Sequence, residues 1–587
     1  MSRSNRRAVI SSVAAAAGAL LTAAPVFGHA GGFSGQEAPG GGTSAAAAAA
    51  TPPASPRAQC GPGDRREPGI QGRVPFGRSG SGFTCNTRLL AQQGKSGGFK
   101  VERFVDRAGR ECAYYDTTLL FPINAVNLSD QPTGVTVLDM SNPAKPVRTA
   151  SLATPAMQTP HESLVLNRQR GLLVAVMGNA AFYPGVVDVY DLNDDCRHPE
   201  LQSSLPVGLL GHESGFAPDG RTFYATSLDT GQVTAVDLTN PKLPVPLWVG
   251  QYDSHGLTIS NDGNRAYMAG LNGLIIVDVS EIQARKPNPQ ERVLSRLRWS
   301  TMTIPQVAHP VTIGGKPFLV EIDEFSTDGG GVVPAVNGSR VGAGRIIDIQ
   351  DERNPRVVSD FRLAVNQPEN RAQIEDDAGA SSPAQGYASH YCNVPQRKEP
   401  GIVACSFIAS GLRVFDIRDP YKPKELAYFV APEGPSSTGG SPSNYAMSSP
   451  SFVPKRREIW YSDGNTGFYA VRVAKGVWPF ATTSAKASRR IRLSVNPNRA
   501  RVGRRKRFSF RATTIANGRR VAVRKATVRF DGRKARTNSK GRVRISGTLS
   551  RRRVYRARAT RKGMRSGKAS VRAVRGRAAQ RVPRFTG

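Results

Sequence analysis

The sequence lacks long hydrophobic runs after its first thirty residues, and it lacks the common catalytic signatures. No later segment approaches the ~18 consecutive apolar residues that would span a membrane. The GxSxG nucleophile elbow, the HExxH zinc motif, the P-loop and a GxGxxG that opens a helix are all absent. The six cysteines form no CxxC zinc pattern. These absences set aside several hydrolase, nucleotide-binding and zinc-thiolate classes.

Acidic residues are almost missing from the last part of the chain. Residues 481–587 contain 36 lysines and arginines against a single acid, Asp531, a net charge of +35. The whole chain carries +37, so the preceding 480 residues are close to neutral. The high charge is therefore a property of one C-terminal region and does not make the whole chain a nucleic-acid binder.

The N-terminus has the layout of an export signal. Arg3, Arg6 and Arg7 precede an alanine-rich apolar stretch, and Gly28-His29-Ala30 fits a small-x-small cleavage site. The sequence predicts a signal peptide over residues 1–30, of the Sec or twin-arginine type, and a secreted or cell-envelope location. The alternative is an uncleaved membrane anchor, which the weak hydrophobicity of alanine disfavours.

Two composition changes divide the rest of the chain. Residues 31–82 are rich in Gly, Ala, Pro and Ser and predict a flexible low-complexity linker. Residues 83–480 repeat one pattern: a glycine, an alternating β-branched run, an aspartate and often an Asn/Asp-Pro turn. Seven copies begin at Gly134, Gly185, Gly231, Gly273, Gly344, Gly411 and Gly467. Copies about 40–50 residues long, each with several short strands, are typical of a β-propeller.

The repeated run, as in Leu274–Asp278 (LIIVD), resembles the LVIVD repeat. The resemblance implies an exported β-propeller family whose members mostly lack an assigned activity. The expected fold class is all-β, a seven-bladed propeller followed by a small β-sandwich. Six blades are the alternative if the decayed seventh copy only completes the ring with N-terminal strands. Within one unit we expect strands at His255–Ser260, Arg265–Leu271, Gly273–Val279 and Arg292–Trp299.

The basic region predicts a separate domain over residues 487–575, with a disordered tail at 576–587. Its segments KATVRFDG and TNSKGRVRI resemble bacterial Ig-like modules, which implies an antiparallel sandwich. The charge favours attraction to an anionic cell-wall polymer or membrane surface, with nucleic acid an unlikely partner in vivo. The plainer interpretation is a solvated, arginine-rich surface.

Five of the seven histidines occupy similar places, at the start of the innermost strand of successive repeats. They are His161, His212, His255, His309 and His390. Inner strands line the channel of a propeller, so these imidazoles are expected to form a partial ring at its mouth. One interpretation is a transition-metal site for copper, iron or zinc. The other is structural, with each histidine bonding within its own blade.

Three neighbouring residues complete the candidate set. Glu162 and Glu213 each follow a histidine, and strand alternation would point them away from the ring. Cys392 lies two residues after His390, so it either joins the ring or forms a disulfide with Cys405.

We expect five repeat aspartates to cap turns, namely Asp139, Asp237, Asp278, Asp348 and Asp416.

Two functions are consistent with these patterns. The first is an exported binding or scaffold propeller, which takes a protein or small-molecule ligand at its upper face and is held near the anionic envelope by the basic domain. The second is a metal-dependent redox enzyme that uses the histidine ring.

Overall fold

The computed structural model describes residues 51–575 except 76, 78–79, 119–132, 179–184, 209–210, 228–229, 329–331, 334–338, 382–385, 436–443, 481–489, 517–518 and 562–563. The predicted signal peptide, the first part of the linker and the predicted disordered tail lie outside these residues. The chain divides into two compact units, Met1–Ala481 and Thr482–Gly587. Within the described part of the chain, no helix has both the length and the hydropathy needed to cross a membrane.

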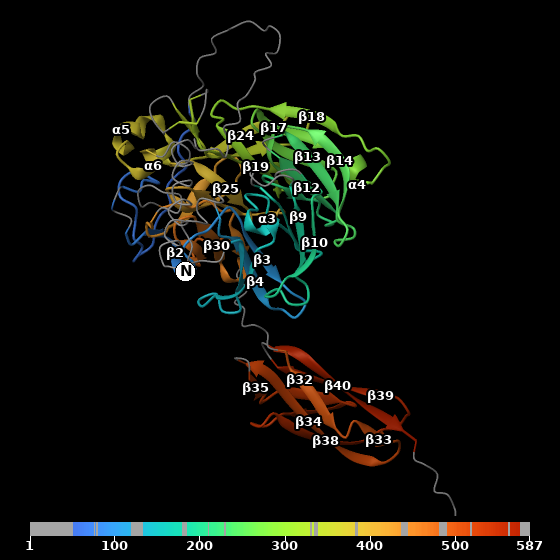
Figure 1. The fold of residues 1–587 in the computed structure, drawn as a ribbon. Coiled ribbons are helices and arrows are strands. Elements are labelled where there is room, and N and C mark those ends of the chain that lie inside the picture. The colour runs from blue at the N-terminus through green and yellow to red at the C-terminus, as the bar shows by residue number, and fades with distance from the viewer. Residues whose placement is uncertain are drawn as a thin grey trace, which may run out of the picture. The chain divides into compact units, whose positions relative to one another are not determined.

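The described residues of the first unit form seven antiparallel sheets of at least four strands (Figure 1). Sheet 1 contains β3 (Val101–Val105), β4 (Glu111–Asp116), β5 (Val135–Asp139) and β6 (Val147–Leu152). Sheet 2 contains β7 (Val165–Asn167), β8 (Leu172–Val176), β9 (Val187–Asp191) and β10 (Glu200–Leu205). Sheet 3 contains β11 (Gly215–Phe216), β12 (Thr222–Ser227), β13 (Gln232–Asp237) and β14 (Val245–Gln251). Sheet 4 contains β15 (Ser254–Ile259), β16 (Arg265–Gly270), β17 (Gly273–Asp278) and β18 (Arg292–Leu297), which confirms the predicted four-strand unit.

Sheets 5 to 7 depart from this simple order. Sheet 5 contains β19 (Ile304–Ile313), β20 (Lys316–Glu324), β23 (Gly344–Asp348) and β24 (Arg356–Phe361), with a hairpin of β21 (Ser326–Thr327) and β22 (Arg340–Val341) inserted. Sheet 6 contains β25 (Ser389–Asn393), β26 (Ile402–Phe407), β27 (Gly411–Asp416), β28 (Lys424–Val430) and, at its edge, β1 (Phe83–Cys85). Sheet 7 contains β29 (Ser451–Val453), β30 (Glu458–Asp463) and β31 (Gly467–Val473), and N-terminal β2 (Thr87–Gln93) supplies its fourth strand.

Helices in the described residues are short. They are α3 (Pro155–Gln158), α4 (Ser280–Gln283), α5 (Arg371–Ile374) and α6 (Ala378–Ser381), with 3-10 turns at Ala364–Asn366, Pro368–Asn370 and Pro454–Arg456. The fold therefore depends on its sheets.

The seven sheets pack face to face in a closed ring, because a separate apolar core fills each gap between neighbours, including the gap between sheets 7 and 1. The β17 strand shows how one strand supplies apolar side chains to two of these cores. Ile275 and Val277 pack toward sheet 3, while Leu274 and Ile276 pack toward sheet 5. A sheet covered on both faces needs an almost continuous apolar run, which is what the repeat supplies.

Each repeat aspartate caps the turn that follows its strand. The carboxylates of Asp139, Asp237, Asp278, Asp348 and Asp416 each accept a hydrogen bond from the backbone N–H two residues later. This confirms the predicted capping role, so these five residues have a structural role.

Residues 51–75 correct the prediction of a flexible linker over 31–82. Arg413, on β27, forms buried ion pairs with Glu67 of this segment at 2.7 Å and with Glu425 at 3.0 Å. Arg73 pairs with Asp377 at 2.8 Å. The segment is packed because charges more than 300 residues away pair with it, and its Pro/Gly-rich composition gives no sign of that.

Three disulfides join the six cysteines: Cys60–Cys85, Cys112–Cys196 and Cys392–Cys405. The predicted Cys392–Cys405 pair is confirmed, and these residues lie directly opposite each other on β25 and β26. Cys392 is therefore not a thiolate ligand.

The second unit consists of two sheets around one core. The first contains β32 (Arg492–Asn496), β34 (Arg505–Ala516), β35 (Arg519–Ala522) and β38 (Arg542–Thr548). The second contains β33 (Arg499–Arg501), β40 (Met564–Val574), β39 (Val554–Arg561), β36 (Thr527–Phe530) and β37 (Arg533–Arg536). Phe508 and Phe510 from the first sheet pack against Phe530 from the second.

Candidate metal centre

Three of the predicted histidines converge on the carboxylate of Glu162. His212 Nδ1 lies 3.0 Å from Glu162 Oε2, and His390 Nε2 lies 3.2 Å from Oε1. His255 Nε2 is 3.9 Å from Oε2. The side chains of Glu162, His255 and His390 are each at most 1% exposed. A buried carboxylate thus sits among imidazoles from sheets 3, 4 and 6.

Glu324 provides a second buried carboxylate at the same place. It ends β20 of sheet 5, and its two oxygens lie 3.1 Å from His255 Nε2 and 2.9 Å from His390 Nε2. Gln306 Nε2 donates to Glu162 Oε2 at 2.7 Å. We name Glu162, Glu324, His255 and His390 the His–Glu cluster.

β-bulges aim side chains at this cluster. In β15 the partners of Ser254 and Gly256 are consecutive residues of β16, so His255 is an extra, bulged residue. The same irregularity places Gln306 in β19 and His390 in β25. A bulge interrupts the regular alternation of a strand and re-aims the inserted side chain. Bulges at the inner ends of sheets 4, 5 and 6 therefore each direct one side chain toward the cluster.

The second ring nitrogen of two histidines faces a carbonyl of the next sheet. His255 Nδ1 lies 3.0 Å from Pro305 O, and His390 Nδ1 lies 2.8 Å from Met447 O. Because a carbonyl only accepts, each Nδ1 must carry the proton and donate. In a neutral imidazole this leaves the lone pair on Nε2, which is the nitrogen that faces the carboxylates.

The charges in the cluster are tightly coupled. Burial disfavours the charged form of His390, but the hydrogen bonds with Glu162 and Glu324 raise its pKa to about 10. Burial also acts to raise the pKa of Glu162, yet His212 and His390 hold it well below its ordinary value. The site therefore favours an ionised Glu162 and a positive charge at His390.

Two predicted ring members are not among the four residues of the His–Glu cluster. His161 has a left-handed backbone (φ +49°), and its ring lies at an angle to those of Phe99 and His212, with a ring nitrogen within 4.8 Å of the ligand atoms of Glu162 and His212. His309 lies three residues beyond the bulge at Gln306, and its Nε2 is 2.9 Å from Cys392 O. Burial, together with the charges of Lys100 and Arg397, lowers the pKa of His309 to about 3, so its ring is neutral. In sheet 5, Gln306 occupies the place expected for His309.

The predicted orientation of Glu162 and Glu213 is wrong, since both point into the interior. The alternation rule fails because β7 and β11 begin only at Val165 and Gly215. Glu213 forms an ion pair with Lys100, whose Nζ is 2.6 Å from Oε1, and accepts a hydrogen bond from the Tyr391 hydroxyl. Burial raises the pKa of Glu213 even though Lys100 opposes the shift. Glu213 directly follows His212, and Tyr391 directly follows His390.

The sequence reasoning missed Glu324 and Gln306. Gln306 is found only with the correct register of β19, which begins five residues before His309. Glu324 ends the second strand of its sheet, a place where β4 and β30 also carry a buried acid, Asp116 and Asp463. Its signal is the acid-rich apolar run FLVEIDEF, in which buried Glu321, Asp323 and Glu324 interrupt a strand covered on both faces.

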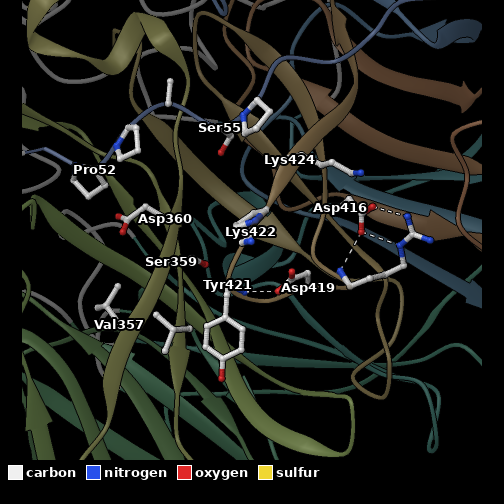
Figure 2. A pocket seen from close by; sticks show the side chains of 16 residues that line it. Pro52, Ser55, Val357, Ser359, Asp360, Asp416, Asp419, Tyr421, Lys422 and Lys424 are labelled. Carbon is white, nitrogen blue, oxygen red and sulfur yellow. Dashed lines mark hydrogen bonds and ion pairs between the residues drawn. The ribbon is translucent and has the colours of Figure 1, made fainter.

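A groove elsewhere on the first unit is lined by none of the cluster residues. This groove, of about 1040 Å³, separates N-terminal residues 52–56 from β24 and the turn after β27. Figure 2 shows Pro52 and Ser55 along one edge and Tyr421, Lys422 and Lys424 across from them. Asp416 in its wall already pairs with Arg418. Among the residues that line this groove, no set of metal-binding side chains converges as in the His–Glu cluster.

Comparison with known proteins supports the fold. The LVIVD repeat model matches residues 128–154 and 257–282. The chain is a repeat β-propeller. No curated protein matches it. One similar solved structure is hydrazine synthase from Kuenenia stuttgartiensis, at 12% identity and TM-score 0.40, covering 65% of this chain and 97% of that one.

Two further solved structures are similar at the same level. A functionally unknown protein from Desulfotomaculum acetoxidans has 12% identity and TM-score 0.35, covering 57% of this chain and 89% of that one. The periplasmic gluconolactonase of Pseudomonas aeruginosa has 14% identity and TM-score 0.35, covering 56% of this chain and 88% of that one. Similarity this low gives no reason to assign the activity of these proteins to this chain. Its function must be inferred from the residues of the site.

Proposed function

We propose that the propeller binds one divalent transition-metal ion through Glu162, Glu324, His255 and His390. The observation that carries this proposal is the direction of the imidazoles. Each Nδ1–H donates to a backbone carbonyl, and each Nε2 faces a carboxylate oxygen at 2.9–3.2 Å. A lone pair on Nε2 and a carboxylate repel each other unless a proton or a metal cation lies between them. In the free protein a proton on His390 Nε2 fills this role, in line with its raised pKa of about 10, and a bound ion would replace it. Fixing Nδ1 by a carbonyl is the usual outer-shell support of a metal-binding histidine.

The spacing and chemistry of the donors suit such an ion. Metal–nitrogen and metal–oxygen bonds of about 2.0–2.2 Å place neighbouring ligands about 3 Å apart. The cluster offers two imidazoles and two carboxylates without thiolate, because Cys392 is in a disulfide. This donor set suits Zn²⁺, Fe²⁺, Mn²⁺ or Cu²⁺, and two carboxylates balance a charge of +2. We leave His212 out of the ligand set because its Nδ1, which lies 3.0 Å from Glu162 Oε2, is also 3.0 Å from the backbone nitrogen of Glu213.

The positions of these residues indicate how the site would hold a bound ion. The four donors come from sheets 2, 4, 5 and 6, so the rigid ring fixes their positions. Burial of the cluster excludes water and strengthens the electrostatic interactions. A bound metal would supply Lewis-acid or one-electron chemistry at the channel, which is the basis of the redox alternative. The adjacent Lys100–Glu213 pair keeps a further buried carboxylate neutralised.

The wider setting of the metal centre is also part of the proposal. We take the seven sheets as the blades of a seven-bladed propeller and the second unit as an Ig-like sandwich. A propeller suits a binding or scaffold role, with a protein or small-molecule ligand at the face near His161. Three disulfides are consistent with export to an oxidising compartment. The basic unit would then hold the exported chain at an anionic wall polymer or membrane surface.

Calorimetric titration of the purified, chelator-treated chain with Zn²⁺ or Co²⁺ tests the metal proposal. We expect one saturable site per chain. Replacing both ligand histidines (His255→Ala, His390→Ala) is expected to weaken binding at least about 100-fold, since even outer-shell changes cost 10–100-fold. The matched control replaces two histidines outside the cluster (His198→Ala, His309→Ala) and should bind as the parent does. A parent without a saturable site, or a double variant that binds equally well, would overturn the proposal.

A further inference from the structure

One face of the second unit carries a row of four cations in direct register. In the sheet β37–β36–β39–β40, Lys534 pairs with Arg529, Arg529 with Arg558, and Arg558 with Lys568. Partners in an antiparallel register project from the same face of the sheet. All four residues are exposed. We name Lys534, Arg529, Arg558 and Lys568 the cation row.

The cation row has no acidic counterpart within its unit. Asp531 is the sole acidic side chain in residues 481–587. It lies 3.5 Å from Arg533. Like charges directly opposite each other on neighbouring strands destabilise a sheet. The row therefore has an electrostatic cost in the free protein, and an anion that bridges the four strands would remove that cost.

The same face continues the charge beyond the row. Arg556 lies two residues from Arg558 on β39, and Arg572 of β40 is in register with Arg499 of β33. All three are exposed. Adjacent strands are about 4.8 Å apart, so the row extends about 14 Å across the sheet. An extended chain with regularly spaced negative charges fits this geometry.

The residues of the face decide between kinds of polyanion. The exposed positions near the row are Arg, Lys, Ser and Thr, with one valine, Val554, opposite Arg572 and no aromatic side chain among them. Proteins that hold single-stranded nucleic acid stack its bases on aromatic rings. Readers of duplex DNA insert a helix or ribbon into a groove, whereas this surface is a sheet face. We therefore infer that the cation row binds a linear phosphate polymer that carries no bases, by charge pairing alone.

This inference rests on the proposed retention role of the basic unit and assigns it a face and a ligand chemistry. The test uses the full chain and inorganic polyphosphate as the probe, with binding measured at several salt concentrations. Replacing Arg529 and Arg558 by Gln removes two charges from the row. The matched control, Arg511→Gln with Arg542→Gln, removes another exposed cross-strand pair, in register on the opposite sheet.

We expect the row variant to lose affinity at least about 10-fold near physiological salt. Its dependence of log K on log salt should flatten by about 1.4, since each contact contributes about 0.7. The control should change less than about twofold. The row variant should also unfold at a slightly higher denaturant concentration, because its like-charge contacts are gone. A merely misfolded variant would not combine weaker binding with a higher midpoint.

The outcomes separate this inference from the broader retention proposal. If the parent chain binds polyphosphate and both variants lose affinity equally, the cation row is overturned and a diffuse charge effect remains. If the parent does not bind polyphosphate or anionic wall material, the retention proposal fails as well. Tighter binding to duplex DNA, or to vesicles containing anionic phospholipid, than to polyphosphate at equal phosphate concentration would contradict the assigned ligand.

Discussion

Replacing Arg413 with methionine is expected to lower the free energy of unfolding of the propeller by about 3–5 kcal/mol. The Arg413 guanidinium is fully buried between Glu67 and Glu425, which are buried as well. It also lies over the ring of Tyr428, 4.5 Å from its centroid. Methionine keeps much of the volume, but it leaves buried Glu425 without a cation and Glu67 with only the partly exposed Arg57, 3.1 Å away. Urea unfolding of the full chain measures the loss.

The Arg413 prediction has a local readout and an internal control. Since Glu67 belongs to the N-terminal segment, limited proteolysis of Arg413→Met should cut within residues 51–82 earlier than in the parent chain. A triple variant with Glu67→Gln and Glu425→Gln removes all three charges and should recover most of the stability, because the cost comes from unpaired charge. If the single variant unfolds like the parent, the segment is not held by this triad.

Metal is expected to stabilise the parent chain and to do little for Glu162→Gln. An ion that binds only the folded state adds about 4 kcal/mol when its free concentration is a thousand times Kd. Glutamine keeps the shape of Glu162 and one carbonyl oxygen, but it removes the charge that His212 and His390 contact. Unfolding curves with and without Zn²⁺ should therefore separate for the parent and nearly coincide for the variant.

Glu213→Gln is the matched control for this second prediction. Glu213 is also a buried glutamate that follows a histidine, but it pairs with Lys100 and contributes no proposed ligand. Its loss should lower the stability without metal, because Lys100 is then buried without a partner. The increment that Zn²⁺ adds should remain. A metal increment that survives in Glu162→Gln, or disappears in Glu213→Gln, would move the binding site away from the His–Glu cluster.

Much of the propeller could be predicted because its physical requirement is repeated in every sheet. The alternation of Leu274 to Val277 between two cores, the capping by Asp278 and the strand bounds of sheet 4 all follow from a unit that packs on both faces. The convergence of His212, His255 and His390 was also accessible, since repeat register places equivalent residues at one end of the channel.

The exact residues of the site depend on irregular backbone geometry, which the repeat pattern of the sequence does not reveal. A bulge in β19 places Gln306 at the cluster, and His309 falls farther along the strand. Glu162 points inward because its segment precedes β7, where strand alternation does not apply. Glu324 ends a second strand, and the repeat pattern was not read for the acids at that end of the strands. The packing of residues 51–75 rests on charge pairs across more than 300 residues, such as Arg73 with Asp377.

Elemental analysis of the purified chain, expressed with transition metals in the medium and freed of loosely bound ions by gel filtration, decides whether the His–Glu cluster holds a metal ion. We expect about one transition-metal ion per chain in the parent, and less than a tenth of an equivalent in the variant that lacks His255 and His390. A parent chain that retains no stoichiometric metal, while it remains folded, would contradict the metal proposal. The imidazoles and carboxylates of the cluster would then be held by protons alone.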